Sequence, residues 1–131
     1  MKVLFIDEEK PLVDIYRDVF QKNGYEFITT FDIQKALNLT ELEKPDIVLL
    51  DIVIPKPDNV IAEQGYEYLK KVKSNPDTKN IPVIVFSNLD SPEDRKKYKE
   101  FGAAAFMFKR DCTTKEVLEV VEQIIKLYKN K

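Results

Sequence analysis

The sequence of 131 residues contains no histidine and only one cysteine, Cys112. The lack of histidine excludes histidine-based acid–base catalysis and histidine-ligated metal sites in this chain. A single cysteine excludes an internal disulfide framework, which favours a reducing compartment, and we expect a cytoplasmic location. No apolar run approaches the ~20 residues of a membrane span, and the apolar part of MKVLFIDEE is too short for a signal peptide. We therefore expect no association with a membrane.

The chain also lacks a strong charge of either sign. Its 21 basic and 23 acidic residues give a net charge of -2, and the two signs are mixed along the sequence. A strong field for nucleic acid is therefore not expected, and we predict no nucleic-acid partner. Apolar residues make up 44% of the chain, which is ordinary for a globular domain, and the length fits one domain with a real core.

Five short apolar runs alternate with five segments of helical spacing. Runs 46–50 and 82–86 carry no polar alternation, as expected for central parallel strands buried on both faces, whereas run 25–30 alternates. The pattern predicts a parallel sheet covered by helices on both faces. The predicted strands are 2–6, 25–30, 46–50, 82–86 and 104–108, and the predicted helices are 11–24, 32–44, 65–76, 91–102 and 113–131.

Helix ends carry recognisable signals. Caps of the Ser/Thr/Asp type, prolines in the first turn and glycines after the last turn all occur where the apolar spacing changes. The expected signals are Pro11 and Gly24 for the first helix, Asp32 for the second, Asn75 and Pro76 after the third, Ser91, Pro92 and Gly102 for the fourth, and a Thr113–Glu116 capping box for the fifth.

Polar residues follow four of the predicted strands. Asp7 and Glu8 end the first, Asp51 the third, Ser87 the fourth and Lys109 the fifth. In open parallel sheets, ligands bind at the carboxyl ends of the strands. If these strands are neighbours, three carboxylates, a hydroxyl and an ammonium meet in one pocket.

Such a group of side chains has a specific chemistry. Three clustered carboxylates repel one another unless a cation lies among them, and Mg²⁺ prefers one or two carboxylates with water and phosphate oxygens. The hydroxyl and the ammonium are donors that suit phosphate oxygens. Aspartate is also an established nucleophile for phosphoryl groups. The pattern therefore predicts a site where a phosphoryl group is placed on Asp51.

The motifs LFIDEE, DIVLLD…P, PVIVFS and GAAAFMFK, in this order, resemble the response-regulator receiver domain of two-component signalling. The resemblance covers about residues 2–128. It implies that Asp51 is the phosphoacceptor and that Asp7 and Glu8 hold Mg²⁺, with Asp51 and the backbone carbonyl of Val53 as further ligands. It also implies a flavodoxin-like, doubly wound fold with five strands in the order 2-1-3-4-5.

The resemblance assigns the remaining site residues as well. Ser87 matches the residue that binds the phosphoryl group, Lys109 its lysine partner, and Phe106 the aromatic residue that turns inward on activation. Such a domain is a phosphoacceptor and not an enzyme in the usual sense, since it catalyses only its own phosphotransfer and self-dephosphorylation. Val53 and Leu89 flank the line of water attack and cannot orient water, so we expect that dephosphorylation is slow.

The sequence departs from the family pattern in three places. Residues 56–64 (KPDNVIAEQ) lengthen a usually short turn, either for partner recognition or as a tolerated surface insertion. Asn88 replaces a small residue. Arg110 replaces a proline that often has a cis bond; such a bond costs ~3 kcal/mol without proline, so the turn after the fifth strand is expected to differ.

We expect a single receiver domain, 1–131, without an output domain, because residue 131 ends the last predicted helix. A histidine kinase or a histidine phosphotransfer protein would supply the phosphoryl group, and the output would be contact with a downstream protein that the sequence does not name.

Leu118 and Ile125 lie away from the centre of the inward stripe of the last helix. They indicate either a partner or homodimer surface or a broad core face. The stripe itself is Val117, Val121, Ile124 and Tyr128.

Two other functions fit part of this pattern. A haloacid-dehalogenase-like phosphatase also uses an aspartate after an apolar strand, but it has a second aspartate where this chain has Val53. The chain also has no room for the cap domain of such enzymes. A degenerate receiver would act as a phosphorylation-independent binding module, and the presence of Asp51, Ser87, Lys109 and the acidic pair argues against it.

Overall fold

The computed structural model describes residues 1–51, 62–88 and 92–130. Their strands form one parallel sheet in the order β2-β1-β3-β4-β5, which confirms the predicted flavodoxin-like topology. The strands are β1 (Lys2–Ile6), β2 (Glu26–Thr30), β3 (Ile47–Leu50), β4 (Val83–Ser87) and β5 (Ala105–Phe108).

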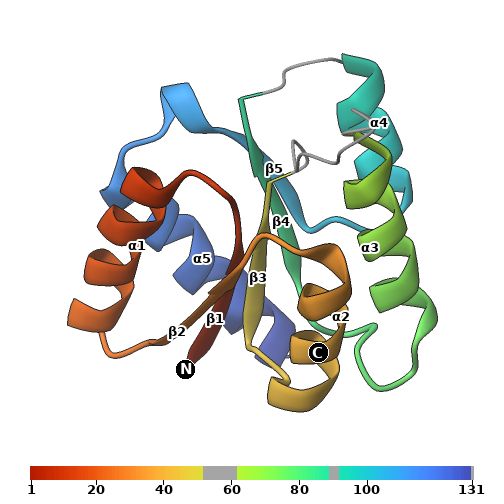
Figure 1. Cartoon of the computed structure of the whole chain (residues 1–131), viewed down its shortest axis with the longest axis horizontal. Helices are drawn as coiled ribbons and strands as arrows, with labels where there is room; N and C mark the ends of the chain where they lie inside the picture. Colours follow the sequence, from red (N-terminus) through yellow and green to blue (C-terminus); the bar gives the residue numbers. More distant parts are fainter. Residues whose placement is uncertain (52–61, 89–91, 131) are drawn as a thin grey trace.

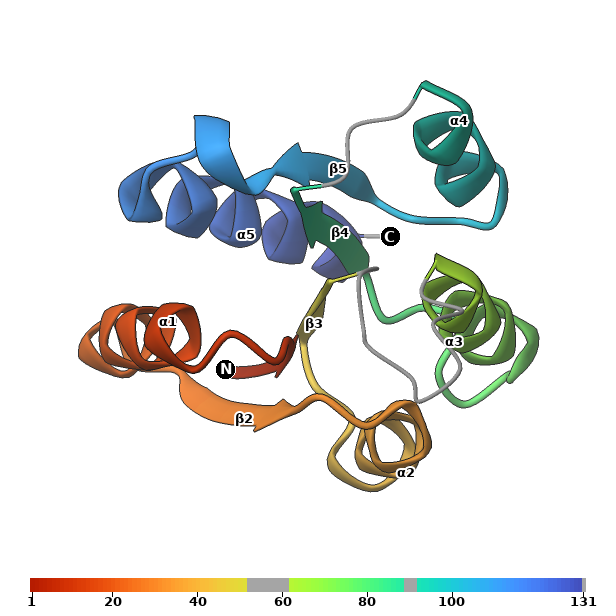
Figure 2. The same cartoon turned by 45° about the horizontal axis from the view of Figure 1, so that its top comes forward.

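Helices cover both faces of this sheet (Figure 1). Seen with the top turned forward, α1 and α5 lie on one side and α2, α3 and α4 on the other (Figure 2). No helix in the described part of the chain is long and apolar enough to cross a membrane. The α-helices are α1 (Lys10–Lys22), α2 (Ile33–Glu43), α3 (Ala62–Ser74), α4 (Pro92–Glu100) and α5 (Thr114–Lys129), and a 3₁₀ turn, η1, spans Lys109–Asp111.

The sheet separates two hydrophobic cores. Side chains alternate between the two faces of a strand, so Val3 and Phe5 of β1 pack toward α1 and α5, whereas Leu4 and Ile6 pack toward α2, α3 and α4. Strands β3 and β4 are divided in the same way, and every residue of both is buried. This confirms the prediction from their uninterrupted apolar runs.

Strand β2 differs from its prediction in one respect. The sequence predicts alternation, but Phe27 to Thr30 are all partly buried. The reason is its place at the sheet edge, where β2 pairs only with β1 and is contacted by α1 on one side and α2 on the other. Neither face is fully covered and neither is fully open to solvent.

The helix-end signals predicted from the sequence are found at the helix ends in the described part of the chain. The side chain of Asp32 accepts a hydrogen bond from the Lys35 amide at 2.9 Å, and Thr113 and Glu116 form both bonds of the capping box. Gly24 and Gly102 have φ of +84° and +97°, a region that glycine enters without strain. Helix α3 begins three residues before its prediction, and the predicted cap Ser91 lies outside the described residues.

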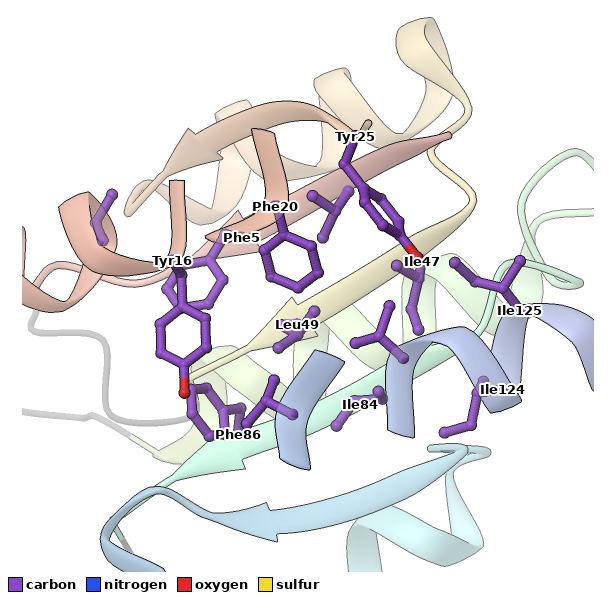
Figure 3. Close-up of a cluster of buried hydrophobic side chains, with 14 residues drawn as sticks. Phe5, Tyr16, Phe20, Tyr25, Ile47, Leu49, Ile84, Phe86, Ile124 and Ile125 are labelled. Carbon is purple, nitrogen blue, oxygen red and sulfur yellow. The ribbon is translucent and has the colours of Figure 1, made fainter. Parts of the chain in front are cut away.

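The buried face of helix α5 is broader than the predicted stripe of Val117, Val121, Ile124 and Tyr128. Val117, Val121 and Ile124 are buried as predicted, but Ile125 is also buried, with 5% of its surface exposed. Figure 3 draws Ile124 and Ile125 together in the core between α5 and the sheet. Leu118 is partly buried against the same core. Of the two interpretations of Leu118 and Ile125, the broad core face is therefore confirmed for Ile125, because two adjacent rows of α5 side chains pack against this core.

The capping box of α5 gives a stability prediction. Replacing Thr113 with Ala leaves an amide of the first turn without its acceptor, and the free energy of unfolding should fall by about 1 kcal/mol. Urea denaturation followed by circular dichroism measures this change. Lys115→Ala, at an exposed position of the same turn, is the matched control and should change stability by less than about 0.5 kcal/mol. Equal effects of the two substitutions would contradict a role for the cap.

Candidate functional site

The site is built at the carboxyl edge of the sheet by the ends of four strands. The Asp51 amide donates to the Ile6 carbonyl at 2.9 Å, and the Asp7 amide donates to the Thr30 carbonyl at 3.1 Å. These bonds continue the sheet ladder one residue beyond β3 and β1. Both aspartates are therefore held on rigid backbone, and both are buried.

Lys109, directly after β5, places its ammonium between these carboxylates. Its Nζ lies 2.6 Å from Asp7 Oδ2 and 3.0 Å from Asp51 Oδ2. Glu9 Oε1 is farther away, at 3.8 Å. The Lys109, Asp7 and Asp51 side chains are nearly excluded from solvent, whereas Glu9 is half exposed. The structure thus brings together three residues that lie up to 102 positions apart in the sequence.

Two opposing effects act on the pKa of Lys109. Burial by itself lowers this pKa, but the charges of Asp51 and Asp7 and their hydrogen bonds outweigh burial and raise it above its usual value. A raised lysine pKa favours the folded state below the unfolded value of about 10.4 and loses this contribution as the pH rises through the folded value. Lys109 is therefore charged at neutral pH.

The third carboxylate near Asp7 and Asp51 belongs to Glu9. One carboxylate oxygen from each of these three residues lies within 4.8 Å of the others. The carboxylate of Glu8 is outside this group; Glu8 is exposed and lines a cavity of about 390 Å³ beside α1 and β2. Sequence reasoning missed Glu9, because only the turn of the loop decides which of two adjacent glutamates faces the site. That turn is set by the Glu9 amide, which donates to Asp7 Oδ1 at 2.9 Å.

Ser87 and Phe106 lie on β4 and β5, the two strands that follow β3 in the order of the sheet. Ser87 is the last residue of β4, fully buried, and is opposite Phe108 in the β4–β5 register. Phe106 is opposite Val85 and only partly buried. One edge of the Phe106 ring contacts Tyr98 of α4, and the Arg95 guanidinium lies 5.1 Å from the centre of its ring. Phe106 thus sits between the sheet and α4.

Three sequence features concern neighbouring loops. Val53, Leu89 and the 56–64 insertion lie at least partly outside the described residues, so their predicted roles stay predictions. Arg110 lies in the 3₁₀ turn Lys109–Asp111. The described residues contain no cis peptide bond, so the link from Lys109 to Arg110 is trans, and α5 is reached through this short turn.

A comparison with protein families identifies the domain. The model of the response regulator receiver domain matches residues 3–122. The chain belongs to this family. The receiver domain is a module of two-component signalling, and the match includes Asp7, Asp51, Ser87 and Lys109. The resemblance noted from the motifs is therefore confirmed at the level of the family.

Solved receiver structures have the same fold. A CheY-like receiver from Methanospirillum hungatei superposes with a TM-score of 0.86 at 20% identity and covers 98% of this chain and 96% of its own. The receiver domain of a Francisella response regulator has a TM-score of 0.79 at 27% identity, with 95% and 96% covered. The Mn²⁺-bound form of the response regulator Rcp1 has a TM-score of 0.71 at 25% identity, with 94% and 90% covered.

The Lys109 cluster gives a second prediction. Lys109→Met leaves two buried carboxylates without their cation, so the free energy of unfolding at pH 7 should fall by about 3–5 kcal/mol. The loss should be smaller at about pH 4, because the destabilisation comes from uncompensated negative charge, which acid reduces for carboxylates in general. Urea denaturation at both pH values measures the difference.

The exposed Lys115 offers a control for this experiment. Lys115→Met removes the same charge from the surface and should change stability little at either pH. A loss in Lys109→Met that does not depend on pH would show that packing of the lysine stem, and not its charge, stabilises the site.

Proposed function

We propose that this receiver domain accepts a phosphoryl group on Asp51 and works as a phosphorylation-dependent signalling switch. The observation that supports this best is the placement of the Asp51 carboxylate, which is buried and rigidly held, with the Lys109 ammonium 3.0 Å away and Asp7 beyond it. A nucleophile needs such a fixed position, because phosphoryl transfer is catalysed mainly by positioning and by charge stabilisation.

In the proposed reaction, an oxygen of Asp51 attacks the phosphorus of a phosphohistidine on a partner kinase or phosphotransfer protein. The new bond joins Asp51 to phosphorus, and the bond between phosphorus and the imidazole nitrogen breaks. The imidazole leaves with the electron pair and takes up a proton from solvent. Lys109 donates to an oxygen of the phosphoryl group and balances its charge, while the buried Ser87 supplies a hydroxyl donor.

The donor set of the site fits a hard divalent cation such as Mg²⁺. Asp7, Glu9 and Asp51 offer carboxylate oxygens within 4.8 Å of one another, and only oxygen donors are in this group, as Mg²⁺ requires. Bound there, the cation would neutralise phosphoryl oxygens during transfer. The structure of the Mn²⁺-bound form of the similar response regulator Rcp1 supports a divalent cation in this fold. Glu8 and the Val53 carbonyl remain ligands implied by family resemblance.

The proposed switch uses Ser87 and Phe106. A phosphoryl group on Asp51 would draw the Ser87 hydroxyl toward it, and the partly buried Phe106 would turn into the space that this movement opens. The surface made by α4, β5 and α5 would then differ between the two states. Such a change is a shift between two packings that both exist before phosphorylation.

The output in this proposal is a contact with another protein in the cytoplasm. The domain would catalyse only its own phosphotransfer and slow self-dephosphorylation. A histidine kinase or phosphotransfer protein is the proposed donor. Homodimer formation through the α5 side loses its support from Ile125, which is buried.

The phosphoacceptor is tested with acetyl phosphate as a small phosphodonor. Wild-type protein should gain one hydroxylamine-sensitive phosphoryl group in the presence of Mg²⁺, and removal of the metal with EDTA should prevent this. Asp51→Asn should show no labelling, because the other buried aspartate beside Lys109, Asp7, has one oxygen bonded to the Glu9 amide and the other to Lys109. Intact-mass spectrometry measures the product.

Asp46→Asn is a suitable control for this test, since Asp46 lies at the opposite end of β3, where it accepts from the Lys2 amide. Its labelling should match wild type. Undiminished labelling of Asp51→Asn would overturn the assignment, and an unlabelled wild type would favour the degenerate receiver.

The metal ligands are tested by substituting the two adjacent glutamates separately. The geometry predicts that Glu9→Gln weakens Mg²⁺ binding more than Glu8→Gln, because only the Glu9 carboxylate adjoins Asp7 and Asp51. Mg²⁺ titration by calorimetry measures the affinities directly, without phosphorylation. The opposite order would assign the ligand position to Glu8, in agreement with the family motif.

A further inference from the structure

Helix α4 is attached to the domain by one buried side chain. Its sequence, PEDRKKYKE, is almost entirely charged, and Tyr98 is its one buried residue, with none of its surface exposed. The remaining residues are exposed apart from the half-buried Asp94. A helix with so little apolar surface depends mainly on Tyr98 for its position, because tertiary packing of an apolar face supplies most helical stability.

Tyr98 is the middle member of three aromatic rings that contact one another in series. On one side its ring lies 4.1 Å, centre to centre, from the ring of Tyr66 of α3, with an angle of 27° between them. On the other side it meets the edge of Phe106 of β5, at 6.3 Å and 71°. We call Tyr66, Tyr98 and Phe106 the aromatic stack. It joins α3, α4 and β5.

A hydrogen bond and a cation reinforce the contact between α3 and α4. The Tyr66 hydroxyl donates to Asp94 Oδ1 in the first turn of α4, and Lys97 Nζ lies 4.2 Å from the centre of the Tyr66 ring. Both contacts come from α4 and converge on Tyr66. Tyr66 therefore holds the side of Tyr98 that faces away from β5.

The stack also reaches the electrostatic environment of the phosphoacceptor. Burial is the largest cause of the raised pKa of the Tyr98 phenol, and the negative charges of Asp94 and Asp51 contribute to it. The same ring touches Phe106, which the proposed function assigns to the switch.

We propose that Tyr98 is the positioning residue that transmits the state of Asp51 to helix α4. When Phe106 turns inward, it displaces or releases the edge of Tyr98, and α4 follows because it has no second buried side chain to hold it. The inference rests on the proposed function of Asp51 and Phe106, but the anchoring of α4 by Tyr98 is independent of phosphorylation. The ring, and not the hydroxyl, carries the effect.

The anchoring is tested in the unphosphorylated protein by amide hydrogen exchange. Tyr98→Leu removes the stack, so the protected amides of residues 92–100 should exchange at least about tenfold faster, as a locally unfolding segment does. Tyr25→Leu is the matched control, since Tyr25 is a buried tyrosine of the core on the other face of the sheet. It should not accelerate exchange in α4 beyond any change in global stability. Unchanged protection of α4 in Tyr98→Leu would overturn the inference.

The transmission is tested by repeating the exchange with Mg²⁺ and beryllium fluoride, a phosphoryl mimic. In wild type, exchange in α4 should change by a factor within the range of about 5–150 that is usual for coupled sites. In Tyr98→Leu this response should be absent although acetyl phosphate still labels Asp51. Tyr98→Phe keeps the ring and should keep the response. A Tyr98→Phe protein without the response, or a Tyr98→Leu protein that still shows it, would overturn the proposal.

The NMR resonances of the Tyr98 ring in the wild-type protein provide a further test. This test does not depend on whether a substituted protein folds. The resonances should shift when beryllium fluoride is added, and unchanged resonances in a protein that binds the mimic would contradict the proposal. Failure of wild-type protein to take up either phosphodonor or mimic would instead contradict the proposed function. In that case the exchange of unphosphorylated Tyr98→Leu still decides whether Tyr98 anchors α4.

Discussion

The ionic cluster of Lys109 with Asp7 and Asp51 is the interaction on which the site depends. Two carboxylates are withdrawn from water at the edge of the sheet, and one ammonium lies 2.6 Å and 3.0 Å from them. Such a group is stable only when each partner is held in good geometry, because a buried charge without its counter-ion costs several kcal/mol. The strand ends of β1, β3 and β5 must therefore arrive at the same edge, which the order 2-1-3-4-5 provides.

The two faces of the sheet are built differently. Toward α1 and α5, the rings of Phe5, Tyr16 and Phe86 pack closely with aliphatic residues of α5. Toward α4, the aromatic stack makes the contact, and the helix itself is polar. Elements that move are drawn from regions with few buried apolar contacts. Helices α1 and α5 each bury several side chains against the sheet, whereas α4 buries only Tyr98.

Most of the fold could be predicted from the sequence, because local patterns carry the needed information. The fully apolar run before Asp51 required a strand buried on both faces, and the caps Asp32 and Thr113 marked helix starts that the structure reproduces. Side-chain direction was predicted less well. The sequence left Ile125 open between a partner surface and a broad core face, and it is buried. Glu9 was not considered although it adjoins the two aspartates. The directions of the Ile125 and Glu9 side chains differ from those of their neighbours by a rotation of one residue along the chain. The periodicity of apolar residues does not resolve so small a difference.

The sequence by itself determined which chemical groups are present and at which strand ends they occur. Asp7, Asp51, Ser87 and Lys109 follow from apolar runs and the rule that strand ends share an edge. Only the tertiary structure decided which groups touch. Whether Glu8 or Glu9 faces the aspartates depends on one hydrogen bond in the loop, between the Glu9 amide and Asp7. The placement of Tyr98 between Tyr66 and Phe106 depends on how α3, α4 and β5 pack. Contacts between residues far apart in the chain arise from packing of whole elements, and no local pattern encodes them.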